Sequence, residues 1–97
     1  MNHYNLIMTV NIDLLKKKII YRSNYRGTKE MDKLLSSFII NYLNSFNKSE
    51  LILLEKFLEN EDEDLYKFYN GFKTKNMIDD NKISQLFKKF KYKTIDV

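Results

Sequence analysis

The sequence predicts an all-α protein that folds as a compact five-helix bundle in a single domain. Proline is absent and glycine occurs only twice, which disfavours a turn-rich β architecture, while apolar residues recur three and four positions apart. A chain of 97 residues with 43% hydrophobic content can bury one core and hardly more. We expect a flexible N-terminal lead at 1–10, a helical domain at 11–90 and a flexible basic tail at 91–97.

The first two helices are predicted by an apolar face and by residues that favour helix ends. Asn11 is a good N-cap, and the helix that follows it should end near residues 21–24. The second helix is expected to begin at Gly27, because Gly27 followed three residues later by Glu30 has the spacing of a capping box, with glycine in the cap position. The apolar positions are Ile12, Leu15 and Ile19 in the first helix, and Met31, Leu34, Leu35, Phe38, Ile39, Tyr42 and Phe46 in the second.

A third and a fourth helix are expected in the middle of the chain. Asn47 or Ser49 starts the third, and the acidic run at 61–64 opens the fourth, which Gly71 terminates. An EF-hand loop at this run is disfavoured, since lysines stand where glycine and glutamate are required, so we expect Asp62 to cap the fourth helix. The inward positions are Leu51, Leu54, Phe57 and Leu58 in the third helix, and Leu65, Phe68, Tyr69 and Phe72 in the fourth.

The fifth helix is expected to begin at a cap formed by Asp79 or Asp80. Short connections between antiparallel neighbours then give a compact bundle. Aromatic residues at helical spacing indicate a packed core rather than a cofactor site. The inward positions of this helix are Ile83, Leu86, Phe87 and Phe90, and the aromatic core residues are Phe38, Tyr42, Phe46, Phe57, Phe68 and Phe72.

Composition excludes several classes of function. The chain has no cysteine and one histidine, His3, so a disulfide framework and a cysteine- or histidine-based metal site are not expected. No apolar run approaches the roughly 20 residues of a membrane span. No Ser/His/Asp arrangement or glycine-rich phosphate loop is available, so we expect no enzymatic activity from this chain alone.

Two arginines mark the most informative segment. Arg22 and Arg26 are the only arginines among seventeen basic residues, and Gly27 follows the second of them. A guanidinium group can pair bidentately with a carboxylate, and glycine lets a partner approach the backbone closely. Together with Glu30 they would form a patch suited to another protein. In the alternative, Gly27 ends the first helix, Glu30 caps the second, and Arg26 pairs with Glu30 across the turn.

The run Arg26-Gly27-Thr28-Lys29-Glu30 resembles the Arg-Gly-x-x-Glu turn of the small FAD-assembly factors of succinate dehydrogenase. The following residues 31–38 are similar to the Glu-x-Asp-x-x-Leu-x-x-Phe run of that family, and 62–68 to its Asp-Pro-Asp-Leu-x-x-Trp stretch. The resemblance covers roughly residues 15–72. The departures from the family pattern include Asn24, Tyr25, Glu63 and Phe68.

The resemblance implies a non-catalytic assembly factor that binds the flavoprotein subunit of succinate dehydrogenase and promotes covalent attachment of FAD to it. The flavoprotein of fumarate reductase is a further candidate client. FAD would belong to the client, with no cofactor bound permanently here. Arg26 and Glu30 would make charged hydrogen bonds to the client, and Gly27 would allow its close approach. The surrounding surface would comprise Tyr21, Arg22, Tyr25 and Asp32.

We further expect a protein of the bacterial cytoplasm that is a monomer when free, with no nucleic-acid partner and no membrane insertion. The alternative is a small basic helical interaction module, either antitoxin-like or associated with nucleic acid. A net charge of +4 and a pI near 9.2 motivate that alternative.

Overall fold

The computed structural model describes residues 11–91, which contain five α-helices, one 3₁₀ turn and no strand. This confirms the predicted all-α five-helix bundle. The predicted lead at 1–10 and all but the first residue of the predicted tail lie outside the described part. The elements in chain order are α2 (Ile12–Asn24), α3 (Lys29–Tyr42), the 3₁₀ turn η1 (Leu43–Ser45), α4 (Lys48–Phe57), α5 (Asp62–Tyr69) and α6 (Lys82–Lys89).

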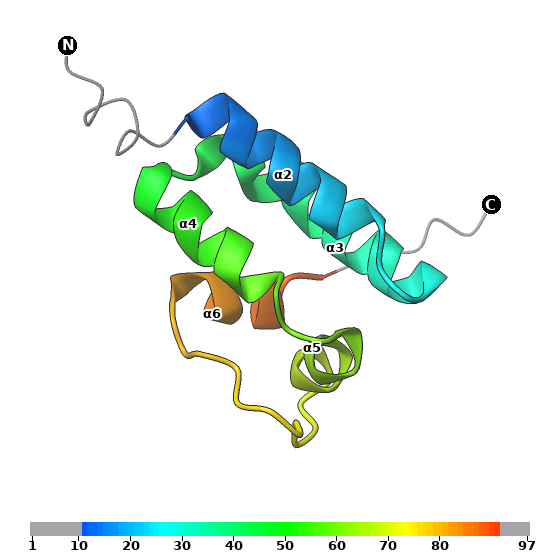
Figure 1. The fold of residues 1–97 in the computed structure, drawn as a ribbon. Coiled ribbons are helices and arrows are strands. Elements are labelled where there is room, and N and C mark those ends of the chain that lie inside the picture. Colours follow the sequence, from blue (N-terminus) through cyan, green and yellow to red (C-terminus); the bar gives the residue numbers. More distant parts are fainter. Residues whose placement is uncertain (1–10, 92–97) are drawn as a thin grey trace, which may run out of the picture.

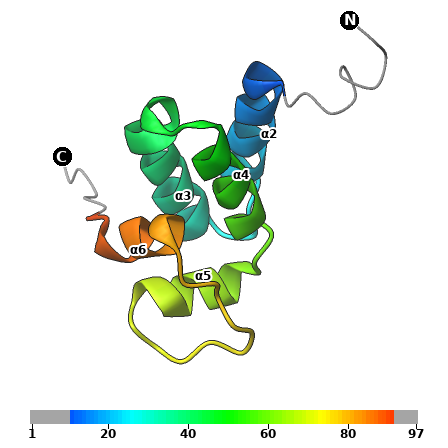
Figure 2. The same ribbon diagram turned by 90° about the vertical axis from the view of Figure 1, so that its left-hand side faces the viewer.

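Helices α2, α3 and α4 form the larger part of the bundle, and α5 and α6 lie across one end of it (Figures 1 and 2). Helix α2 packs against both α3 and α4, α4 also contacts α6, and α6 contacts α5. The turn between α2 and α3 lies at the same end of the bundle as α5, since Arg26 and Gly27 of this turn both bond to Asp62 of α5 (Figure 2). None of the helices in the described part is long and apolar enough to cross a membrane.

The core is a single cluster to which all five helices contribute. Phe87 of α6 is fully buried at its centre, with its ring centroid 5.4 Å from that of Phe38, 5.1 Å from Phe57 and 5.2 Å from Tyr69. Rings at such distances and tilts attract each other beyond the burial of their apolar area. The aromatic residues thus join α3, α4, α5 and α6, as the spacing of apolar residues predicts.

Phe72 departs from the predicted core. It is 65% exposed, because Gly71 adopts a left-handed φ of 78° and turns the chain away from the bundle. The backbone N–H groups of Gly71 and Phe72 donate to the carbonyls of Phe68 and Lys67, at 3.2 and 2.8 Å. This pair of bonds is the Schellman motif, which confirms Gly71 as the residue that terminates α5.

Two of the predicted helix starts are confirmed by side-chain hydrogen bonds. Asn11 accepts from the backbone N–H of Leu14 at 3.0 Å, and Asn47 accepts from that of Glu50 at 2.9 Å. The carboxylate of Glu50 in turn accepts from the backbone N–H of Asn47, which completes a capping box.

The other predicted starts are wrong by one or two residues. Helix α3 is capped by Thr28, whose hydroxyl accepts from the N–H of Met31 at 3.2 Å, rather than by Gly27, which has no side-chain acceptor. Helix α6 is capped by Asn81 rather than by Asp79 or Asp80. The Asn81 side chain accepts from two backbone N–H groups at once, whereas Asp80 accepts from the side chain of Gln85 and Asp79 pairs with Lys56.

Candidate functional site

The side chain of Arg26 is directed at the junction between α4 and α5. Its Nε donates to Oδ1 of Asp62 at 2.6 Å, and its Nη1 and Nη2 donate to the carbonyl oxygens of Leu58 and Asn60 at 2.8 and 2.9 Å. A longer bond of 3.4 Å joins Nη1 to the carbonyl oxygen of Arg22. The side chain of Arg26 is only 10% exposed. The guanidinium group is therefore bonded mainly within its own chain.

The backbone beside Arg26 is held by two carboxylates. The N–H of Gly27 donates to Oδ2 of Asp62 at 2.6 Å, and the N–H of Arg26 donates to Oδ1 of Asp32 at 2.6 Å. A Cβ atom at Gly27 would lie 3.3 Å from Oδ2 of Asp62, closer than most such contacts in proteins. Glycine at this position thus lets the Asp62 carboxylate reach the backbone.

These contacts correct two expectations. Arg26 pairs with Asp62, not with Glu30 as the alternative interpretation of the turn supposed. Asp62 does not cap α5, because its carboxylate turns toward Arg26 and Gly27. The N-cap of α5 is Glu61, which makes no side-chain capping bond. Asp62 is the first residue of the stretch that resembles the family's Asp-Pro-Asp-Leu run. The sequence therefore indicated the position of Asp62 but not its bond to Arg26.

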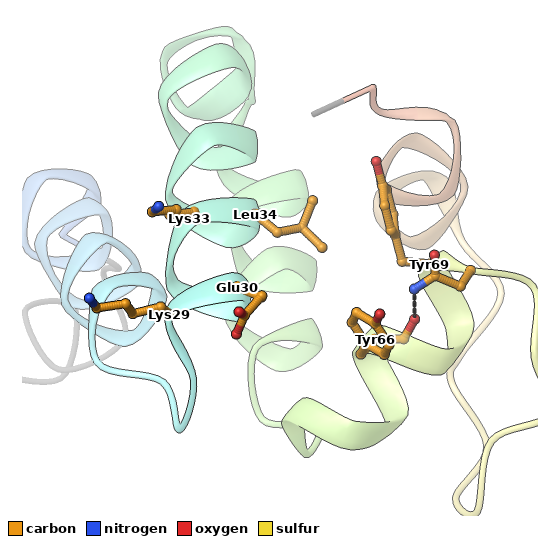
Figure 3. Close-up of a pocket in the computed structure, with 7 residues that line it drawn as sticks. Lys29, Glu30, Lys33, Leu34, Tyr66 and Tyr69 are labelled. Carbon is orange, nitrogen blue, oxygen red and sulfur yellow. Dashed lines mark hydrogen bonds between the residues drawn. The ribbon is translucent and has the colours of Figure 1, made fainter. Parts of the chain in front are cut away.

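A hollow of about 560 Å³ lies between this turn, the start of α3 and the outer side of α5. A second hollow of about 420 Å³ continues along α3 and α5 and shares Glu30 and Tyr66 with the first. Figure 3 shows Glu30 and Leu34 on α3 facing Tyr66 and Tyr69 on α5. The first hollow is lined by Gly27, Thr28, Glu30, Met31, Asp62, Glu63 and Tyr66, and the second by Lys29, Glu30, Lys33, Leu34, Tyr66, Tyr69 and Asn70.

The predicted site residues divide into exposed and inward groups. Glu30 is exposed and has no ion-pair or hydrogen-bond partner among residues 11–91. Tyr21, on the last turn of α2, and Tyr25, its C-cap, are also exposed, and their ring centroids lie 4.6 Å apart. Arg22 lies 3.9 Å from Glu59 in a partly exposed pair. Arg26 and Asp32, by contrast, are engaged within the turn.

Sequence reasoning missed two residues that shape this region, Asp62 as the partner of Arg26 and Tyr66 as the wall of both hollows. Tyr66 is half exposed on α5, and its position outside the apolar stripe could have indicated a surface role. In the described part, no group of three or more His, Cys, Asp or Glu side chains is arranged to hold a metal ion.

Comparison with known proteins decides the family. A family model described as the flavinator of succinate dehydrogenase matches residues 17–92, most of the chain. The chain belongs to this family. The resemblance rested on residues up to about 72, whereas the matched residues continue to 92, past the end of α6. It confirms the resemblance carried by the Arg-Gly-x-x-Glu turn, and it does not favour an antitoxin-like or nucleic-acid-associated module.

Several curated members of the family are similar to this chain. Succinate dehydrogenase assembly factor 2 of Debaryomyces hansenii is 39% identical over 56 residues, which are 58% of this chain and 39% of that protein. Assembly factor 2-A of Drosophila willistoni is 30% identical over 79 residues, 79% of this chain and 50% of that protein. Assembly factor 2 of Saccharomyces cerevisiae is 36% identical over 78 residues, 79% of this chain and 48% of that protein.

This chain spans half or less of the length of these relatives. All three are named mitochondrial proteins and come from yeasts and a fly. The expected location in a bacterial cytoplasm is therefore contradicted by the relatives' names. No solved structure matches the chain.

Proposed function

We propose that this protein binds the flavoprotein subunit of succinate dehydrogenase and promotes covalent attachment of FAD to it. The family description as a flavinator of succinate dehydrogenase supports the activity, and the relatives' names support a role in assembly. FAD belongs to the client, and this chain holds no cofactor of its own. The flavoprotein of fumarate reductase is a further candidate client, and the free protein is a monomer.

The mechanism is binding rather than enzymatic catalysis. A binder that prefers one conformation of its client shifts the client's population toward it, by as much as the difference in affinity allows. If that conformation brings the accepting side chain of the client and the flavin into line, the barrier to bond formation falls by several kcal/mol, roughly the scale of orientation effects. No group of this chain needs to touch the reacting atoms.

The docking face comprises the residues of the Arg-Gly-x-x-Glu turn and the end of α2. The observation that carries this assignment is the hollow beside Gly27, because the family motif and an open, largely apolar concavity coincide there. Met31 is the buried apolar residue that lines it, and the exposed residue Glu30 borders both this hollow and the second one, which Leu34 lines. The residues that would contact the partner are Tyr21, Arg22, Tyr25, Gly27 and Glu30. Arg26 and Asp32, which the sequence also placed at this face, hold the turn from within.

Co-expression with the apo-flavoprotein subunit tests the proposal. In-gel fluorescence of covalently bound flavin should rise when this chain is present, and the two proteins should co-purify. Glu30→Gln should lower both signals, because the substitution removes a charge from the rim while the exposed position leaves the fold intact. Asp79→Asn is a matched control, since Asp79 is an exposed acid that pairs with Lys56 of α4 and lines neither of the two hollows. Covalent flavin that is the same with and without the chain would refute the activity.

A further inference from the structure

The guanidinium group of Arg26 has little left to offer a visiting molecule. Arginine has five N–H donors, and Arg26 makes four hydrogen bonds to acceptors of its own chain. The closest is the Asp62 carboxylate, whose own side chain is mostly buried. One N–H of Nη2 remains, and any further bond to a partner would displace Asp62 or a backbone carbonyl and leave that acceptor unpaired.

The acceptors explain why an arginine occupies this position in a chain rich in lysine. Helix α4 ends at Phe57, so the carbonyls of Leu58 and Asn60 lie beyond its last turn, where helix geometry provides no donor. A planar guanidinium reaches both carbonyls and a carboxylate in three directions, whereas a lysine ammonium would act as a point charge. The positive charge also suits the negative end of the α4 dipole.

Asp62 connects Arg26 to the docking face. One carboxylate oxygen accepts from Arg26 and the other from the N–H of Gly27, so the backbone at Gly27 is fixed relative to the start of α5. Gly27 and Asp62 line the same hollow as Glu30 on α3 and Tyr66 on α5. The relative position of its two walls therefore depends on the bonds between Arg26, Asp62 and Gly27.

From this geometry we infer that Arg26 and Asp62 are positioning residues: they form an internal clamp that preorganises the docking face and do not themselves contact the partner. The inference rests on the proposed function, which supplies the partner, and it assigns a role to Asp62 that the family motif does not include. A preformed face binds more tightly, since less conformational freedom is lost on association.

A double-mutant cycle tests the clamp with Arg26→Lys, Asp62→Asn and the double variant. The dissociation constant for the purified flavoprotein subunit is measured at a temperature where circular dichroism shows each variant to be folded. Each single substitution should weaken binding about tenfold, and the double variant should be no weaker than the worse single one, because residues in direct contact are non-additive. Asp79→Asn is the matched acidic control and should bind like the wild type.

Several outcomes would overturn the inference. If Asp62→Asn binds normally while Arg26→Lys does not, Arg26 contacts the partner directly. If the two losses add, the residues act independently. If both folded variants bind like the wild type, the clamp serves stability alone.

Amide hydrogen exchange at Gly27 tests the clamp without the partner, and it remains informative if Arg26→Lys does not fold. In Asp62→Asn the amide oxygen can still accept from Arg26, but the NH₂ group then faces the N–H of Gly27. Exchange at Gly27 should therefore become faster, whereas exchange at the wild-type rate would overturn the clamp. If instead the wild-type chain fails to bind the flavoprotein and fails to raise covalent flavin, the proposed function fails, independently of the clamp.

Discussion

Asp64 is a buried carboxylate that holds the long connection between α5 and α6 against the bundle. It accepts from the backbone N–H of Lys75 at 2.8 Å, and from the backbone N–H and Nδ2 of Asn76 at 3.3 and 2.9 Å. Burial by itself would raise the pKa of Asp64, but these hydrogen bonds and the nearby charge of Lys67 outweigh it and lower the pKa below its ordinary value of 3.8.

This shift predicts an acid-sensitive contribution to stability. Because the folded-state pKa is the lower one, the contribution is fully present above the ordinary value of 3.8 and is lost as the pH falls from there through the folded-state pKa. Urea unfolding across this range should show that the wild type loses more stability on acidification than Asp64→Asn. The pKa of Glu50 is also lowered, by its bonds to Lys82 and to the backbone of Asn47. Because Glu50 is present in both proteins, its contribution cancels when their acid sensitivities are compared. Equal acid sensitivity of the two proteins would contradict the prediction.

Helix α6 depends on its neighbours more than on its own sequence. A helix of eight residues is too short to persist alone, since isolated helices shorter than roughly 12–15 residues are marginal in water. Its start is fixed by the capping box of Asn81 and Ser84, and Lys82 forms an ion pair with Glu50 of α4. At its other end the Tyr69 hydroxyl donates to the carbonyl of Phe90 at 2.6 Å. The buried ring of Phe87 supplies the central apolar contact.

Removing that ring should loosen α6 from the rest of the bundle. Phe87→Ala is expected to cost about 3–5 kcal/mol of unfolding free energy, because it removes a fully buried side chain and leaves a cavity. Phe72→Ala provides the matched control, since the ring of Phe72 is exposed and its loss should change stability little. Denaturant unfolding of both variants measures the difference, and equal stabilities would show that α6 does not pack as described.

The whole bundle should unfold as one cooperative unit. Residues of all five helices meet in a single buried cluster, and no second core exists within residues 11–91 that could melt separately. Single domains of this size usually unfold in two states. Helical circular dichroism and the near-ultraviolet signal of the tyrosines should therefore follow one common transition on heating. A separate early transition of either signal would mean that α5 and α6 detach before α2, α3 and α4.

The amino-acid sequence by itself determined which segments are helical, because a helix places an apolar face every three to four residues and its end signals act within one turn. Asn11, Asn47 and Gly71 are such signals, and the structure confirms all three. The motif at residues 26–30, together with the runs at 31–38 and 62–68, also indicated the family, which the comparison with known proteins then established.

Only the tertiary structure decided what the motif arginine does. Arg26 and Asp62 are 36 positions apart, and their pairing depends on how α4 returns the chain to the turn after α2. Local spacing offered Glu30 as the nearest carboxylate, yet the folded chain supplies a better acceptor from α5 together with two free carbonyls. The exposure of Phe72 could not be predicted from local sequence either, because the periodicity of apolar residues does not show in which direction a left-handed glycine turns the chain.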